Sequence, residues 1–154
     1  MDSISRVSMR ELVLTRLNNS SKPITELGLS WSLTCDFERI KVSSDYIQKL
    51  EGLEVIRGLR VLRLSNNRIE WIENLVCVSL TLTHLDLSHN RISLIDNLAQ
   101  ISRLEKLNLS HNRISELKAG SISNLKSLCV LDVSHNCVTR KRDLYNLEPL
   151  APTL

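Results

Sequence analysis

Three histidines recur at one position of a repeated phrase, and imidazole nitrogens are common zinc ligands. His89, His111 and His135 each stand in a Ser-His-Asn triplet. A zinc site needs its ligands to converge on one point, with nitrogens at about 2.0 Å from the metal. Stacked repeats instead hold equivalent side chains side by side, and no cysteine or carboxylate is paired with these histidines. We therefore interpret them as exposed turn residues and expect no metal site.

The serine of the same triplet is a candidate nucleophile. Ser88, Ser110 and Ser134 form a column, but no base and orienting acid accompany them at triad geometry. The sequence holds no glycine-rich phosphate loop and no paired acids that could act together. We therefore expect a non-catalytic protein with no cofactor and no small-molecule substrate.

Composition argues against two further classes of partner. The 154 residues include 20 basic and 17 acidic ones, for a net charge of +3, which is too balanced for the basic face typical of nucleic-acid binding. No run of about 18 apolar residues occurs, so we expect no membrane span. The N-terminus lacks the apolar region of a signal peptide. The cysteines form no CxxC pair, which indicates reduced thiols in an intracellular protein: Cys35, Cys77, Cys129 and Cys137.

A sequence repeat predicts the secondary-structure elements that position these side chains. Four asparagines recur 22 to 24 residues apart, and Asp45 lies 22 residues before the first: Asn67, Asn90, Asn112 and Asn136. The phrase before each anchor alternates apolar and polar residues, which predicts a short strand with its leucines on one side. Apolar residues then recur every three positions, which suits a helical or 3₁₀ turn. One such unit cannot bury its apolar side alone, so we expect the units to stack with their strands in a parallel sheet.

Each anchor has a structural task where its strand ends. Backbone groups lose their ladder partners there, and a carboxamide can both donate to them and accept from them. We expect the stacked asparagines to form a buried ladder. Ionised Asp45 can only accept, so the first unit should hold its turn less well.

Three phrases carry a family resemblance: LRVLRLSNNRIEWIENL, LTHLDLSHNRISLIDNL and LEKLNLSHNRISEL. They resemble the leucine-rich repeat consensus LxxLxLxxNxI, specifically its 22-residue SDS22-like class. The resemblance spans residues 37–138 as five repeats. It implies an α/β solenoid with short parallel strands on a concave face, helical or 3₁₀ return segments on a convex face, and protein binding through the concave face.

The N-terminal end of a solenoid needs a cap. Ser8 and Glu11 form a capping box, which predicts a helix at about residues 9–17. We assign this helix to an N-terminal cap of residues 1–36, in which a degenerate repeat after Pro23 is left open.

At the other end, residues 139–154 continue as the return segment of the last repeat. Leu144, Leu147 and Leu150 keep its spacing of three. No amphipathic capping helix follows them in the sequence. We expect a truncated C-terminal cap or a partner that covers this edge.

Side chains between the buried strand residues form the candidate partner-binding surface. They are Arg39, Lys41, Val61, Arg63, His84, Asp86, Lys106, Asn108, Val130 and Asp132. The first two units are basic, whereas the third and fifth carry aspartate. A protein partner with an acidic segment should therefore bind near Arg39, Lys41 and Arg63. The alternative is that these charges only keep the sheet soluble.

Two further sets of side chains lie outside these strands. Arg68, Arg91 and Arg113 follow the anchors, and we expect nearby acids to neutralise them, with phosphate or acidic-peptide binding as the alternative. Trp71 and Leu94 occupy equivalent positions. We expect them to cover the return segments rather than to form an exposed apolar contact.

Together these features predict a non-catalytic scaffold or adaptor that binds a partner protein. The resemblance implies a cytoplasmic setting, with the cytoskeleton, the centrosome, the cilium and the nucleus left open. It also leaves open a phosphatase-regulatory subunit. A further alternative is a truncated structural fragment of a larger repeat protein.

Overall fold

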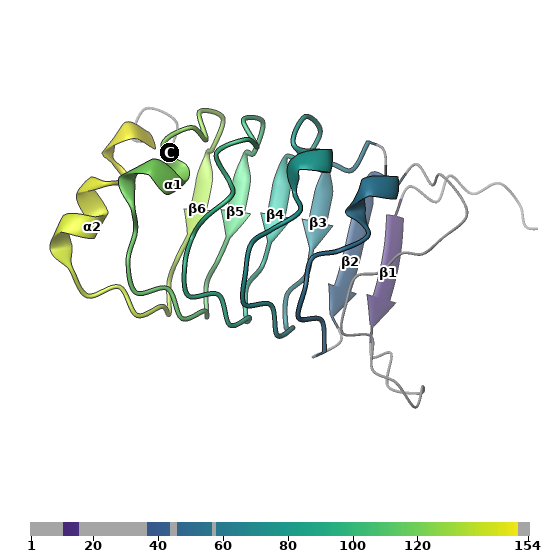
Figure 1. Cartoon of the computed structure of the whole chain (residues 1–154), viewed down its shortest axis with the longest axis horizontal. Coiled ribbons are helices and arrows are strands. Elements are labelled where there is room, and N and C mark those ends of the chain that lie inside the picture. Colours follow the sequence, from purple (N-terminus) through teal and green to yellow (C-terminus); the bar gives the residue numbers. More distant parts are fainter. Residues whose placement is uncertain (1–10, 16–36, 44–45, 57, 151–154) are drawn as a thin grey trace, which may run out of the picture.

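Six parallel strands form one sheet in the computed structural model, in the order in which they occur along the chain. The structure describes residues 11–15, 37–43, 46–56 and 58–150. The strands are β1 (Glu11–Thr15), β2 (Arg39–Ser43), β3 (Val61–Arg63), β4 (His84–Asp86), β5 (Lys106–Asn108) and β6 (Val130–Asp132). They stack along the long axis of the molecule (Figure 1). Among the described residues, no helix is long and apolar enough to cross a membrane.

The return segments cover the other side of this sheet and contain only short helical turns (Figure 1). They are η1 (Leu53–Val55), η2 (Val76–Val78), α1 (Ala119–Ile122), α2 (Lys141–Tyr145) and η3 (Glu148–Leu150), where η marks a 3₁₀ turn. Each unit is thus a strand, a turn and a mostly extended return. The expected leucine-rich solenoid with parallel strands is confirmed.

The core lies between the sheet and the return segments. Leu62, Leu85 and Leu107 are in register on neighbouring strands and are at most 1% exposed. Return-segment residues such as Ile95 and Leu98 close the core from the other side and are equally buried. Burying one such side chain contributes about 1.5–3 kcal/mol. Because every unit packs on its neighbours, the core is one continuous cluster.

The expected asparagine ladder is present. Asn90 Nδ2 donates to the carbonyl of Leu64 in the preceding unit (2.9 Å) and to Leu87 in its own unit (3.0 Å). Its Oδ1 accepts from the amide of Ile69 at 3.0 Å. Asn67, Asn112 and Asn136 repeat this arrangement. The side chain thereby satisfies buried backbone groups that neither strand nor turn can pair.

A second asparagine position, which the repeat analysis missed, recurs seven residues after an anchor. Asn74 donates from Nδ2 to Leu50 at 2.8 Å, and Asn97 donates to Ile72 at 2.7 Å. Both have a positive φ of 57–58°, and Gly52 occupies the same left-handed position with a φ of 79°. Asparagine and glycine are the residues that tolerate this conformation best.

The helix expected at about residues 9–17 is wrong over the described part of that segment. Glu11–Thr15 is strand β1, which pairs in parallel with β2. Leu12 and Leu14 alternate with period two and lie in register with Ile40 and Val42. An isolated helix of nine residues is marginal in water. A strand instead gains a full hydrogen-bonded neighbour, and the β-branched residues between and after the leucines favour it.

Two other expectations fall outside the described residues. These are the degenerate repeat after Pro23 and the weaker turn at Asp45. Neither is tested.

The C-terminal return segment differs from its expected burial pattern. Leu150 is buried, but Leu144 is 57% exposed and Asp143 is only 3% exposed. Helix α2 turns Asp143 toward the core and its neighbour Leu144 outward. Leu147 and Leu150 follow after the end of this helix, and Leu150 lies in η3. Within the described part of the chain, Asp143 Oδ2 has no hydrogen-bond partner.

Candidate functional site

The ten predicted partner-binding residues form two rows across the sheet. The strand registers align them as Arg39, Val61, His84, Lys106 and Val130 in one row, and as Lys41, Arg63, Asp86, Asn108 and Asp132 in the other. Strands β2 to β5 bury the residue between their two row members against the core, and Leu131 on β6 is partly buried. We call the surface formed by the two rows the sheet face.

The acidic and amide members of the second row also hold the strand ends. Asp86 Oδ1 accepts from the backbone amide of Ser88 (3.0 Å) and from its hydroxyl (2.7 Å). Asn108 makes the same two bonds with Ser110. The sequence analysis missed this local turn, although the phrase Asp/Asn-x-Ser is its usual signal.

Asp132 completes this set on β6. Its Oδ1 accepts from the amide of Ser134 at 2.9 Å. The hydrogen bonds from Ser134 lower the pKa of Asp132, and burial opposes them only in part. The carboxylate is therefore stabilised in its charged form by its own turn.

The basic end of the sheet face has no such engagement. Arg39, Lys41 and Arg63 are exposed, and in the described part of the chain none of them belongs to an ion pair. Arg63 lies in register with Lys41 on one side and with Asp86 on the other. On the other side of β2, Glu11 of β1 lies in register with Arg39. The three cations lie on two adjacent strands and give this end of the sheet face a positive local charge, which a rigid backbone holds in place.

His84 lies at the middle of the first row. Its Nδ1 is 2.9 Å from the hydroxyl of Thr83. Its pKa is lowered, first by burial and then by the charges of Lys106, Arg63 and Arg39, which outweigh the opposing Glu105. The ring is therefore biased toward its neutral form in the free protein.

A shallow hollow of about 250 Å³ opens between the two rows over β4 and β5. Leu85 and Leu107 lie at its floor through their backbone, because their side chains are buried in the core, and its C-terminal wall includes Val130, which is 49% exposed. An exposed apolar side chain among polar groups is a common feature of a contact site.

Comparisons with known proteins bear on this arrangement. Three family models described as leucine-rich repeats match residues 58–78, 78–94 and 102–150. The chain is a leucine-rich repeat protein. No curated protein gives a significant match to its sequence.

Solved structures of other leucine-rich repeat proteins share the fold. An internalin (InlF) of Listeria monocytogenes is 28% identical with a TM-score of 0.62, over 72% of this chain and 32% of that one. The functional domain of InlJ from the same organism is 27% identical with a TM-score of 0.57, over 82% and 26%. A leucine-rich repeat protein of Leptospira interrogans is 22% identical with a TM-score of 0.58, over 77% and 29%, and shows the fold alone. The present chain spans about a third or less of each of these three.

The InlJ structure is described as including a cysteine ladder. The described cysteines of this leucine-rich repeat protein, Cys77, Cys129 and Cys137, are free and exposed. They occupy three different positions of the repeat, so they do not lie in register as a ladder would.

The histidine column of this leucine-rich repeat protein is exposed, as expected. The rings of His89, His111 and His135 stack with centroids 4.1 Å apart and interplanar angles of 9° and 12°. Face-to-face rings cannot point their nitrogens at one metal ion. The pKa of His111 is lowered by loss of hydration and by the two neighbouring rings. Within the described residues, no cluster of three histidine, cysteine or acidic side chains could hold a metal.

Two expectations about the turns and return segments are wrong. Arg68, Arg91 and Arg113 form no ion pair with the nearby acids in the described chain, and Arg68 instead lies 5.5 Å from the centre of the Tyr46 ring. Trp71 does not cover its return segment but is 59% exposed, whereas Leu94 is half-buried. Ile72 beside Trp71 already fills the core position, so the indole ring has no buried space left to occupy.

Proposed function

We propose that this protein is an adaptor whose sheet face binds an acidic segment of a partner protein. The leucine-rich repeat fold is a typical protein-protein interaction scaffold and is usually non-catalytic. One observation carries the more specific proposal: Arg39, Lys41 and Arg63 are exposed on β2 and β3 and form no ion pair among the described side chains, while Asp86 and Asp132 are engaged by their own serines.

Rigidity supports binding over mere solubility. The backbone that carries the three cations is fixed by strand pairing and by the asparagine ladder, so association orders only side chains. A partner carboxylate that meets a guanidinium gains a charge-assisted, bidentate hydrogen bond. The hollow near Val130 adds apolar area for a side chain of the same partner.

Charge reversal of the three cations tests the proposal. The R39E/K41E/R63E variant should lose capture of partner proteins from cell extract and should keep the circular dichroism spectrum of the wild type. The R103E/K118E/K126E variant is a matched control, since it changes the net charge equally at exposed positions outside both rows. Capture that survives in the first variant, or fails equally in both, would contradict binding through the sheet face.

The cellular setting is a further part of the proposal. The spacing of 22 to 24 residues between repeats supports an SDS22-like adaptor in the cytoplasm, at the cytoskeleton, the centrosome or the cilium. A phosphatase-regulatory role is the alternative. Mass spectrometry of proteins captured by the wild type and lost in R39E/K41E/R63E separates these settings, because a phosphatase catalytic subunit is expected in only one of them.

A further inference from the structure

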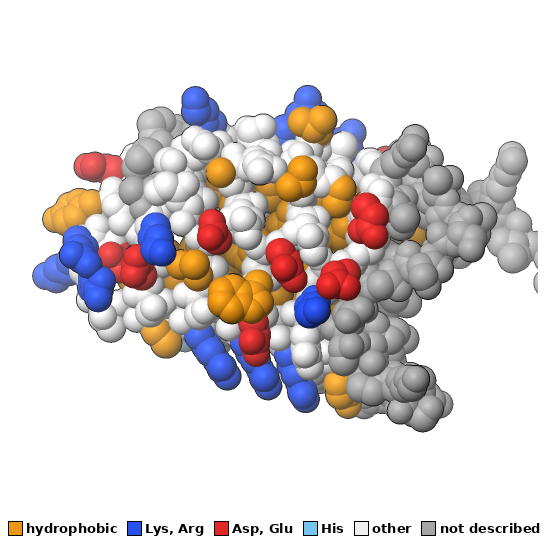
Figure 2. Space-filling view, viewed as in Figure 1, with side chains coloured by type: hydrophobic (Ala, Val, Ile, Leu, Met, Phe, Trp, Pro, Cys, Tyr) orange, Lys and Arg blue, Asp and Glu red, His pale blue; other side chains and the backbone are white. Residues whose placement is uncertain are grey.

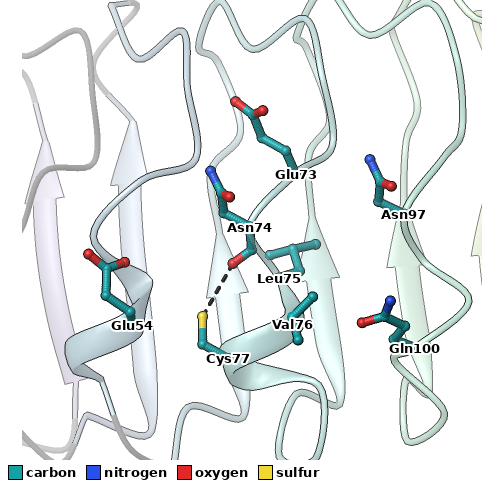
Figure 3. Close-up of a pocket in the computed structure, with 8 residues that line it drawn as sticks. All are labelled: Glu54, Glu73, Asn74, Leu75, Val76, Cys77, Asn97 and Gln100. Carbon is teal, nitrogen blue, oxygen red and sulfur yellow. Dashed lines mark hydrogen bonds between the residues drawn. The ribbon is translucent and has the colours of Figure 1, made fainter.

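A larger hollow lies on the opposite side of the molecule, across the return segments of three successive units: those that contain η1 and η2 and the one that contains Asn97. Its volume is about 570 Å³. Figure 3 shows its lining: Glu54, Glu73, Asn74, Leu75, Val76, Cys77, Asn97 and Gln100. None of the sheet-face residues contributes to it.

The lining of this hollow is rich in acceptors and lacks cations. Neither Glu54 nor Glu73 belongs to an ion pair in the described part of the chain, and no lysine or arginine lines the hollow. The side-chain amides of Asn74 and Asn97 each donate one hydrogen bond to a backbone carbonyl of the preceding unit. Their carbonyl oxygens remain available as acceptors beside the two carboxylates.

An apolar side chain accompanies these acceptors. Val76, the first residue of η2, lines the hollow and is 64% exposed. Exposed apolar residues scattered singly are ordinary, but this one lies at the wall of a concave site. A ligand would therefore cover apolar area here as well as meet charge.

The surrounding surface carries several acidic side chains. They lie across the middle of the return-segment face, with some basic side chains at the left end of this band and beside the acidic ones at its right, and further basic side chains lie along the upper and lower rims (Figure 2). The charge of Glu54 also reaches Cys77, whose pKa is raised first by burial and then, against its backbone hydrogen bond, by that carboxylate. The field at the hollow thus favours an approaching cation.

We propose that the hollow between η1 and η2 is a second interaction surface, which binds a basic peptide segment of a partner protein through Glu54 and Glu73 and an aliphatic side chain of that segment against Val76. Lysine and arginine side chains carry only donors, which complements a lining dominated by acceptors. The two faces of the protein then select partners of opposite charge. This inference does not depend on binding at the sheet face.

The probe is a fluorescently labelled nonapeptide of alternating lysine and leucine, with a glutamate-leucine peptide as its charge control. Fluorescence anisotropy should show saturable binding of the lysine peptide, with an affinity that falls as salt rises. The E54Q/E73Q variant keeps the shape of the hollow and removes its charge. It should bind roughly tenfold more weakly, since each exposed ion pair contributes modestly.

A matched variant and the native thiol localise the binding. E105Q/E148Q removes two exposed carboxylates that do not line the hollow and should bind as the wild type does. V76S should weaken binding of the lysine peptide but leave binding of spermine, which has cations and no aliphatic side chain, nearly unchanged. The bound peptide should slow the alkylation of Cys77 and leave the alkylation rate of exposed Cys129 unchanged, as measured by peptide mass mapping.

Three results would overturn the assignment. These are undetectable binding of the lysine peptide, equal losses in E54Q/E73Q and E105Q/E148Q, or alkylation of Cys77 at the same rate with and without peptide. The R39E/K41E/R63E variant should still bind the lysine peptide, which separates this surface from the sheet face.

Discussion

Asn112 accepts a hydrogen bond through its Oδ1 from the backbone amide of Ile92, 20 residues earlier, at 2.9 Å. The same carboxamide donates to Leu87 of the preceding unit and to Leu109 of its own unit. One side chain thus ties two repeats together at the point where both strands end. The rigidity of the sheet face depends on these ties.

Loss of one anchor should destabilise the protein strongly. Asn90→Ala leaves the buried amide of Ile69 without its acceptor. It also removes one of two side-chain donors from the carbonyl of Leu64, which keeps its bond from Asn67. An unsatisfied buried group costs about 1–3 kcal/mol, so the free energy of unfolding should fall by about that amount. Urea denaturation measures this. Asn124→Ala, at an exposed position with no side-chain hydrogen bond in the described chain, should change it by less than about 0.5 kcal/mol. Equal losses of stability in the two variants would contradict a stabilising role of the asparagine ladder.

The burial offset in the C-terminal segment predicts a second contrast. Leu85→Ala should cost about 2–5 kcal/mol because Leu85 is 1% exposed in the middle of the core. Leu144→Ala should cost little, since Leu144 lies on the outer side of α2 and is 57% exposed. Denaturant unfolding of both variants checks the contrast. A large loss of stability in Leu144→Ala would instead support the expected spacing of three, in which Leu144 is a core residue.

The turn at Asp86 separates structural from electrostatic roles on the sheet face. Asp86→Asn retains an Oδ1 that accepts from Ser88, as Asn108 does from Ser110 on the next strand. It removes a negative charge beside Arg63, so a glutamate-rich peptide should bind several-fold more tightly while stability stays nearly unchanged. Asp86→Ala loses the turn bonds and should destabilise the protein by about 1 kcal/mol. Isothermal calorimetry and urea denaturation read the two effects, and weaker peptide binding by Asp86→Asn would count against an acidic partner.

His84 should titrate below the ordinary imidazole value of about 6.5. Burial lowers its pKa first, and Lys106 is the strongest of the charges that lower it further. The contribution to stability is therefore present above the ordinary value and is lost as pH falls through the lowered pKa, because the unfolded chain takes up the proton first. NMR titration of the ring should show a higher pKa in Lys106→Gln and no change in Lys126→Gln. An unchanged pKa in Lys106→Gln would show that burial alone sets it.

Sequence reasoning recovered the repeated parts of the fold because the same constraint is written several times. The buried leucines and the asparagines recur in register, so each unit supports the assignment of the next. Strand β1 was missed because a single local signal, the capping box at Ser8, competes with pairing to β2 that only the assembled sheet reveals. Local signals lose to tertiary pairing when the segment is short.

The candidate site shows the same division. Alternation along each strand placed all ten sheet-face residues correctly in two rows. Their role in binding stays a prediction. The bonds from Ser88 to Asp86 and the exposure of Trp71 depend on local turn geometry and on which neighbour already fills the core. The hollow at Glu54 and Glu73 joins residues of successive units, and its only sequence signal is the Asn-Leu pair seven residues after an anchor.

Binding of an acidic segment at the basic end of the sheet face is tested most directly by NMR chemical-shift mapping. Isotope-labelled protein titrated with a glutamate-rich peptide should show its largest shifts in the amides of β2 and β3, around Arg39, Lys41 and Arg63, and these shifts should vanish in R39E/K41E/R63E. Shifts confined to the return segments, or equal shifts in the wild type and the variant, would contradict the account.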